Sequence, residues 1–116
     1  MKILSGKFKN QSVSISRRFV YRPTTSIVRK SLFDALKPLE NKNFLDLYAG
    51  SGMIGFEASS RGADNVTFIE MNKQHMIQIR KSAESIPYSN FNFLVRDSIR
   101  FLKKCEKYAV SYTHLR

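Results

Sequence analysis

The sequence predicts a doubly wound α/β fold with a parallel sheet at its centre. From residue 44 onward, short apolar runs alternate with segments of helical periodicity, in the order strand, helix, strand, helix, strand, helix. A glycine-rich turn follows the first of these runs, at Asp46–Gly55. Such alternation is typical of parallel strands joined by crossover helices. The length of 116 residues, 42% of them hydrophobic, suffices for one modest core.

The first 25 residues predict a basic β-hairpin that precedes the sheet. Apolar and polar residues alternate around a turn signal at Gly6, which is the pattern of paired strands over residues 1–15. Pro23 cannot continue a strand interior, so the hairpin ends before it. Thr24 or Thr25 can then cap a helix by accepting a backbone N–H.

The helix after this cap is predicted to begin near Ser26, and Pro38 and Asn41 mark its end. Its apolar stripe comprises Val28, Leu32, Ala35, Leu36 and Leu39. Arg29 and Lys30 fall off this stripe, so we expect both side chains to point toward solvent or a ligand.

Three strands and three helices make up the predicted α/β core. The strands cover residues 44–48, 66–70 and 91–95, each a short apolar run typical of a buried parallel strand. The helices that follow them cover residues 53–61, 73–86 and 98–105. Gly62 and Pro87 end the first two helices. Asn72 caps the second helix, and Asp97 or Ser98 caps the third.

The turn after the first strand has the composition of a nucleotide-binding loop. Gly50, Gly52 and Gly55 fit the G-x-G-x-x-G spacing, in which glycines permit a tight turn and a close approach of the backbone to a ligand. The helix that begins near Met53 turns its amino end, with unpaired backbone N–H groups, toward this turn. Asp46 lies four residues before Gly50, and its carboxylate can accept hydrogen bonds from a ligand.

Two more carboxylates follow the second and third strands. Glu70 lies twenty residues after Gly50, at the interval where dinucleotide-binding folds carry an acidic residue for a ribose diol. Asp97 could accept from the exocyclic amine of an adenine ring. Because ligands bind beyond the carboxyl ends of parallel strands, we expect one crevice to hold all of these groups. The candidate cofactor-binding residues are Asp46, Gly50, Ser51, Gly52, Gly55, Glu70, Asp97 and Ser98.

Each carboxylate also has a purely structural interpretation. Asp46 would fasten the turn, Glu70 would be a surface charge and Asp97 would only cap a helix. The position of Asp46 favours one cofactor, because a carboxylate there repels the pyrophosphate of a nicotinamide dinucleotide and suits the positive groups of S-adenosylmethionine. No Gly-Lys-Ser or Gly-Lys-Thr follows the turn, which disfavours a P-loop. We therefore predict S-adenosylmethionine as the cofactor.

The charge of the chain predicts a polyanionic partner. Lys and Arg number 20 against 9 Asp and Glu, for a net charge of +11. Residues 1–43 hold ten basic side chains and two acidic ones, so we expect this segment to contact RNA; the alternative is a basic surface that only faces solvent. The candidate RNA-binding residues are Lys7, Lys9, Arg17, Arg18, Arg22 and Thr24. Phe8, Phe19 and Tyr21 lie among them, and either stack on bases or pack the hairpin onto the core.

Other chemistries find less support in the sequence. Cys105 is the only cysteine, which excludes an internal disulfide and a multi-thiolate metal site, and no base is evident that would make it a nucleophile. His75 and His114 are better explained as solvated side chains, so we predict no metal. The chain has neither a long apolar run nor a basic leader, which predicts a cytoplasmic protein without membrane contact.

Several motifs of the chain occur together in one known family. They are Ile3–Lys9, Arg22–Thr25, Val28–Phe33, Asp46–Gly52, Gly55–Ala58 and Ser60–Gly62. With them, residues 1 to about 108 resemble the bacterial RsmD-type 16S ribosomal RNA (guanine-N2)-methyltransferases, which use S-adenosylmethionine. The resemblance implies a Rossmann-like methyltransferase fold, with a cofactor site lined by Asp46, Gly50, Gly52, Glu70 and Asp97. It further implies that the amino-terminal hairpin and Arg22 approach 16S ribosomal RNA or the small ribosomal subunit, and we expect the full-length protein to be a monomer.

One departure from that family concerns catalysis. The family continues into a fourth strand that ends in an Asp-Pro-Pro-aromatic motif, where an oxygen of the first side chain and a backbone carbonyl receive the target amine. This sequence has no such motif, so the catalytic residues are unknown. A second hypothesis is therefore a non-catalytic basic RNA-binding module that retains a vestigial nucleotide pocket.

The chain accordingly divides into three predicted segments. Residues 1–25 form the basic hairpin, and residues 26–108 form a partial Rossmann-like domain with the first half of the parallel sheet. Residues 109–116 are an atypical tail, which we interpret as the non-native end of a truncated reading frame. The alternative is a naturally short cofactor-binding module, whose exposed sheet edges would need cover or a partner.

Overall fold

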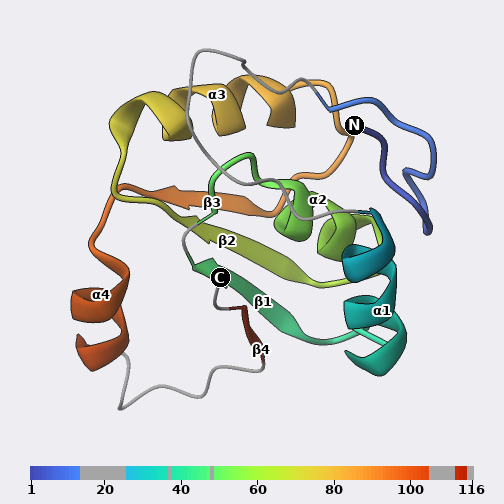
Figure 1. Cartoon of the computed structure of the whole chain (residues 1–116), viewed down its shortest axis with the longest axis horizontal. Helices are drawn as coiled ribbons and strands as arrows, with labels where there is room; N and C mark the ends of the chain where they lie inside the picture. Colours follow the sequence, from blue (N-terminus) through green and yellow to red (C-terminus); the bar gives the residue numbers. More distant parts are fainter. Residues whose placement is uncertain (14–25, 37, 48, 105–111, 115–116) are drawn as a thin grey trace.

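The structure, a computed structural model, describes residues 1–13, 26–36, 38–47, 49–104 and 112–114 (Figure 1). The helices in these residues are α1 (Ser26–Leu36), α2 (Met53–Ser60), α3 (Lys73–Ala83) and α4 (Ser98–Lys104). The strands are β1 (Asn43–Leu47), β2 (Asn65–Ile69), β3 (Phe91–Leu94) and β4 (Tyr112–His114). The predicted order of strands and helices from β1 to α4 is thus confirmed. None of the described helices is long and apolar enough to span a membrane.

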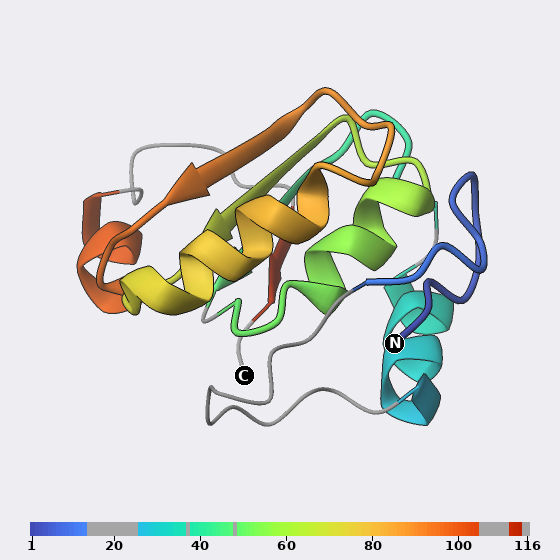
Figure 2. The ribbon, with the colours of Figure 1, turned by 90° about the horizontal axis from the view of Figure 1, so that it is seen from above.

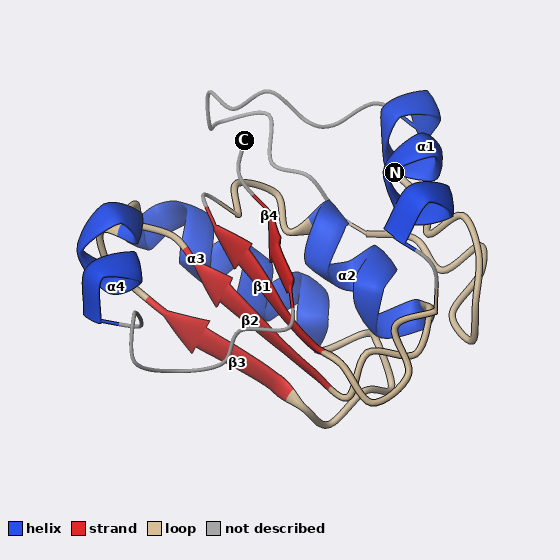
Figure 3. Ribbon diagram, turned by 90° about the horizontal axis from the view of Figure 1, so that it is seen from below, coloured by secondary structure: helices blue, strands red, loops and turns tan. Residues whose placement is uncertain are grey.

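All four of these strands run parallel in one sheet, in the order β3-β2-β1-β4. Helices α2 and α3 lie together on one face of the sheet (Figures 2 and 3). Helix α4 covers the other face, where Phe101 and Leu102 pack against Leu45, Leu47 and Ile69. Because both faces are covered, the fold is the predicted doubly wound α/β arrangement.

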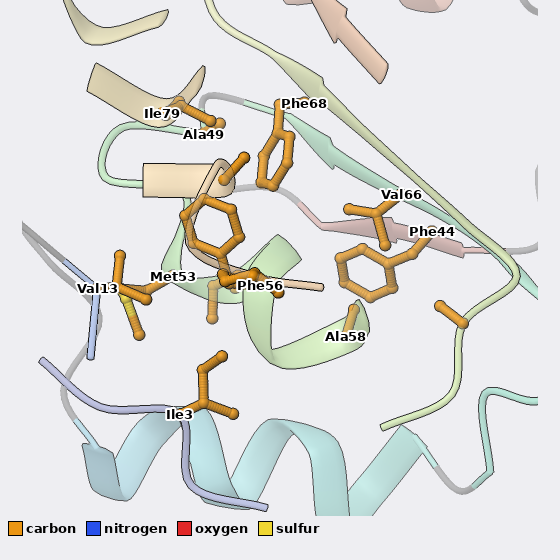
Figure 4. Close-up of a cluster of buried hydrophobic side chains, with 14 of the residues drawn as sticks. Ile3, Val13, Phe44, Ala49, Met53, Phe56, Ala58, Val66, Phe68 and Ile79 are labelled. Carbon is orange, nitrogen blue, oxygen red and sulfur yellow. The ribbon is translucent and has the colours of Figure 1, made fainter. Parts of the chain in front are cut away.

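The larger core lies between the sheet and helices α2 and α3. Strand side chains alternate between the two faces, so Phe44, Val66 and Phe68 point into this core. Phe56 of α2 packs beside Phe68, with ring centroids 5.1 Å apart (Figure 4). Ile3 of the amino-terminal loop belongs to the same cluster, which makes that loop part of the domain.

The described part of the amino-terminal segment, residues 1–13, is paired as an irregular hairpin. Lys2 and Ser12 form one antiparallel bridge. The cross-strand backbone bonds run from Ile3 N to Gln11 O at 3.1 Å, from Asn10 N to Ile3 O at 2.8 Å and from Val13 N to Met1 O at 2.8 Å. Farther along, the N–H groups of Leu4 and Ser5 donate instead to the Glu57 carboxylate of α2, at 2.9 and 3.1 Å. The amino-terminal loop therefore pairs with itself and is also attached to α2.

The buried position of Arg29 corrects the predicted apolar stripe of α1. Arg29 is fully buried, whereas Val28, which we expected in the core, is 56% exposed. The Nε atom of Arg29 lies 3.4 Å from Oε1 of Glu57, which is also fully buried. The guanidinium further donates to the carbonyl oxygen of Lys2 at 2.8 Å. Hydrophobic periodicity does not register a buried ion pair, so the predicted stripe included Leu32 and Leu36, which pack against the core, but missed Arg29.

The Glu57 carboxylate joins three segments of the chain. Besides the amino-terminal loop and Arg29 of α1, it contacts Arg61 at the end of α2, whose Nε donates at 2.9 Å. Burial lowers the pKa of Arg29; the Glu57 carboxylate opposes this shift, and the nearby Arg61 adds to it. The ion pair with Glu57 therefore stabilises the charged guanidinium of Arg29 in a buried position that would otherwise disfavour it.

Strand β4 is an element that the sequence did not predict. It pairs in parallel with residues Phe44 to Asp46 of β1, on the side opposite β2. This pairing covers backbone groups of β1 that would otherwise form an open edge. The interpretation of residues 109–116 as a non-native tail stays a prediction.

We expect Glu57→Ala to destabilise the fold by about 3–5 kcal/mol, because Arg29 would stay buried without its partner. Urea unfolding followed by circular dichroism measures the difference. Glu84→Ala is the control, since this carboxylate is exposed just beyond α3, and it should change the midpoint little. Equal effects of the two substitutions would contradict a central role for Glu57.

Candidate cofactor-binding site

The glycine turn lies between β1 and α2, at the carboxyl end of the parallel sheet. Gly50 and Gly52 have positive φ angles of 58° and 82°, which other residues rarely adopt. Gly55, in the first turn of α2, lies so close to the Phe68 ring that a Cβ would overlap it. The backbone itself therefore requires glycine here, and the third glycine serves helix-to-strand packing.

Asp46 is fully buried near the end of β1. Its Oδ2 accepts from Gly55 N at 3.1 Å, and thereby satisfies an N–H group in the first turn of α2. Ser51 is also buried, and its Oγ accepts from Met53 N at 3.4 Å. Asp46 thus fastens the turn, as its structural interpretation predicts, while contact with a cofactor stays a prediction for Asp46 and Ser51.

Glu70 links the end of β2 to the glycine turn. Its Oε1 accepts from Gly50 N at 2.9 Å, and its Oε2 accepts from Asn72 N at 2.8 Å. His75 Nδ1 lies 3.9 Å from Oε1, and both side chains are 12% exposed. A carboxylate has about four acceptor sites, so Glu70 retains capacity for a ribose diol while it holds the turn. Glu70 is therefore more than the surface charge of its structural interpretation.

Asp97 follows β3 and caps α4. Its Oδ1 accepts from Ile99 N at 2.9 Å and from Arg100 N at 3.1 Å, which is the predicted cap. Ser98, the first residue of α4, is buried. A cavity of about 550 Å³ lies beside this cap and is lined in part by Asp97, Arg100 and Phe101. Asp97 therefore stands at the wall of a space that a ligand group could enter.

The structure brings most of the predicted site residues to the carboxyl edge of the sheet. Hydrogen bonds join Asp46 to Gly55 and Glu70 to Gly50. Asp97 belongs to the same edge through the backbone, because Glu70 N donates to Leu94 O at 3.2 Å. The edge offers carboxylate acceptors and the amino end of α2, which suits a ligand with a diol and positive groups.

Sequence reasoning missed the remaining residues of the cavity beside Asp97. Arg96 precedes this cap, and Arg100, Phe101 and Lys103 follow it on α4. A helical projection of residues 98–104 from the Asp97 cap would have placed positions three to four residues on near it.

The predicted RNA-binding residues are only partly described. Lys7 and Lys9 are exposed on the amino-terminal loop. Phe8, between them, packs against the larger core, which agrees with the packing alternative for this residue. Outside the described residues lie Arg17, Arg18, Phe19, Tyr21, Arg22 and Thr24, and also Cys105.

The family of the chain follows from comparison with known proteins. A family model described as "Conserved hypothetical protein 95" matches residues 1–113. The chain belongs to this family. A curated relative, the Ribosomal RNA small subunit methyltransferase D of Buchnera aphidicola subsp. Acyrthosiphon pisum, is 34% identical over 103 residues, which cover 88% of this chain and 54% of that protein. The RsmD-type resemblance seen in the sequence is thereby confirmed.

Solved structures share the fold of this chain. A hypothetical protein of Thermus thermophilus is 25% identical with a TM-score of 0.80, over 92% of this chain and 61% of that one. The precorrin-6y C5,15-methyltransferase of Geobacter metallireducens GS-15 is 19% identical, with a TM-score of 0.66. The match covers 81% of this chain and 49% of that enzyme's chain. The fold is therefore that of Rossmann-like methyltransferases. The chain spans about half the length of the curated relatives it matches.

We expect Gly55→Ala to destabilise the protein by about 1–3 kcal/mol, because the added methyl group would overlap the Phe68 ring. This cost should exceed the roughly 1 kcal/mol by which alanine is favoured over glycine inside a helix. The double variant Gly55→Ala with Phe68→Leu should lose less stability than the two single changes together. Strictly additive free energies of unfolding would argue against this close packing.

Proposed function

We propose that the chain carries the cofactor-binding part of an S-adenosylmethionine-dependent methyltransferase. One observation carries the proposal: the Glu70 carboxylate bonds to Gly50 N of the glycine turn at 2.9 Å. This bond holds a carboxylate beside the turn and close to the amino end of α2, which supports a role for Glu70 as the acceptor for a ribose diol. The Rossmann-like methyltransferase fold and the family of the chain support the same function.

The residues of the edge fit S-adenosylmethionine in charge and in hydrogen-bonding capacity. Glu70 would accept from the ribose hydroxyls, and Asp97 would accept from the adenine amine across the cavity beside α4. Gly50 and Gly52 would let the backbone approach the cofactor, and Asp46 would place negative charge near the sulfonium. When bound, S-adenosylmethionine supplies an electrophilic methyl group, and these residues contribute orientation and charge.

The proposed substrate is the exocyclic amine of a guanine in 16S ribosomal RNA, within the small ribosomal subunit. The name of the Buchnera relative, a small subunit ribosomal RNA methyltransferase, supports the choice of RNA, and the guanine amine follows from the resemblance of the sequence to the RsmD-type enzymes. The nine basic side chains of residues 1–43 other than the buried Arg29 would supply the charge that an RNA partner requires. We assign no residue of this chain to acceptance of the amine proton, because the sequence lacks the Asp-Pro-Pro-aromatic motif.

The structural roles of Asp46, which bonds to Gly55 N, and Asp97, which caps α4, favour one second candidate, a non-catalytic RNA-binding module with a vestigial nucleotide pocket. The two proposals differ in one readout, the transfer of a labelled methyl group from S-adenosylmethionine to small ribosomal subunits. Transfer by this chain supports the enzyme and excludes the module. A chain that binds RNA but neither binds the cofactor nor transfers its methyl group supports the module.

Glu70→Ala should weaken the binding of S-adenosylmethionine about 10- to 100-fold, because hydrogen bonds to a charged acceptor are lost. Glu70→Gln keeps one acceptor oxygen and should weaken binding less. Isothermal calorimetry measures both, with Glu84→Gln as a control at an exposed carboxylate away from the turn. Unchanged affinity in Glu70→Ala would remove the basis of the proposed site.

Arg17→Glu combined with Arg18→Glu should weaken binding to small-subunit RNA and flatten its salt dependence by about two in the logarithmic slope. The reason is that each arginine is expected to neutralise one phosphate. Filter binding over a series of salt concentrations measures the slope. A control variant with the same change in net charge carries two reversals on α3, Lys73→Glu with Lys81→Glu. Equal salt slopes for the two double variants would refute this RNA contact.

A further inference from the structure

A second cavity lies at the opposite end of the sheet from the glycine turn. It has a volume of about 500 Å³, within the usual range for ligand pockets. Asn65 begins β2 and Asn90 precedes β3, and both line this cavity. The cavity is therefore at the amino ends of the parallel strands, whereas Glu70 and Asp97 follow their carboxyl ends. Nothing in the proposed cofactor site uses it.

One wall of this cavity is the amino-terminal loop, held in place by α2. Lys7 N donates to Ser60 O at 2.8 Å, and Phe8 N donates to Ser60 Oγ at 2.9 Å. The Phe8 ring meets Tyr88 edge to face, with ring centroids 6.3 Å apart and planes at 83°. Both aromatic rings are half-buried, and the Lys7 side chain is exposed. The backbone bonds thus fix Lys7 and Phe8 at the wall of the cavity, beside Tyr88.

The other walls of the cavity, the loop before β3 and the turn before β2, are joined by hydrogen bonds. The Tyr88 hydroxyl donates to Ala63 O, and Asn90 Nδ2 donates to Asp64 O at 2.9 Å. Burial raises the pKa of Tyr88 to about 12, with a further contribution from the Asp64 carboxylate. The phenol therefore stays a neutral donor at neutral pH and holds the loop before β3 against the turn before β2. Such walls need little rearrangement when a ligand enters, which favours binding.

The groups at this cavity match the parts of one nucleotide. Phe8 and Tyr88 pack against the larger core with one side, and their remaining half-buried surface is aromatic surface for a base, as in proteins that bind single-stranded RNA. Lys7 provides a cation for a phosphate. The exposed Asp64 carboxylate accepts from Asn41 N through Oδ1 at 3.3 Å, and as an acceptor it selects a base with N–H donors on its edge. Guanine presents two adjacent donors, N1–H and the N2 amine, whereas uracil presents one.

We propose that this cavity binds a guanosine nucleotide of the RNA strand on which the protein acts. The inference rests on the proposed function, because it takes the partner to be RNA. The bound nucleotide would be a different one from the methylated guanine, since the cavity and the glycine turn lie at opposite ends of the strands. Occupation of the cavity therefore anchors the strand without competing with the cofactor.

Fluorescence anisotropy with labelled single-stranded RNA hexamers tests this inference on the full chain. One hexamer contains only uridine, and the other carries a single guanosine. The guanosine hexamer should bind more tightly, and Asp64→Asn should reduce this preference about tenfold, as expected for loss of a paired contact to a base edge. Lys7→Gln should weaken binding of both hexamers and flatten their salt dependence.

Lys81→Gln is the matched control, since it removes one exposed lysine on α3 outside the cavity. A Lys7→Gln effect no larger than that of Lys81→Gln overturns the inference, and so does a guanosine preference that Asp64→Asn leaves intact. Thermal unfolding and calorimetry with S-adenosylmethionine verify that the variants keep the fold and the cofactor site. If both cavity variants bind RNA as the wild-type chain does, only the role of the cavity is refuted. If the wild-type chain binds the cofactor but neither hexamer, the result also counts against the proposed RNA partner.

Discussion

The buried carboxylate of Glu57 is the interaction on which the rest of the structure depends. A carboxylate buried away from solvent is tolerated only when hydrogen-bond donors and opposite charges replace its lost hydration. Here the donors come from the amino-terminal loop and from Arg61 at the end of α2, and Arg29 of α1 adds an ion pair. These contacts determine which side of α1 faces inward and where the loop crosses α2. The cavity at the amino ends of the strands follows from them, because one of its walls is that loop.

The fold of the central segment could be predicted because its signals are local. Apolar runs gave β1, β2 and β3, and Asn72 and Asp97 cap the helices that they were expected to cap. The burial of Arg29 on α1 could not be predicted, since its partner lies 28 residues away in sequence and periodicity treats arginine as a surface residue. Nor could the attachment of the amino-terminal loop to α2, because Leu4 N bonds there to a carboxylate more than fifty residues distant.

The candidate cofactor site was predictable to the level of strand ends. Topology alone places Asp46, Glu70 and Asp97 at one edge, since parallel strands share their carboxyl ends. The sequence could not show which structural role each of these carboxylates has. Asp46 holds α2, Asp97 caps α4, and Glu70 both holds the turn and keeps acceptor capacity. Such differences depend on distances between loops, which no spacing rule contains.

The attachment of the amino-terminal loop to α2 has a consequence for how the chain folds. Strands β1, β2 and β3 and their crossover helices form from one contiguous stretch, so they close only short loops. Leu4 and Phe8 are synthesised first, yet their partners Glu57 and Ser60 follow 53 and 52 residues later. Contacts of such separation form late and slow folding. The basic loop therefore cannot dock until α2 has left the ribosome and packed onto the sheet.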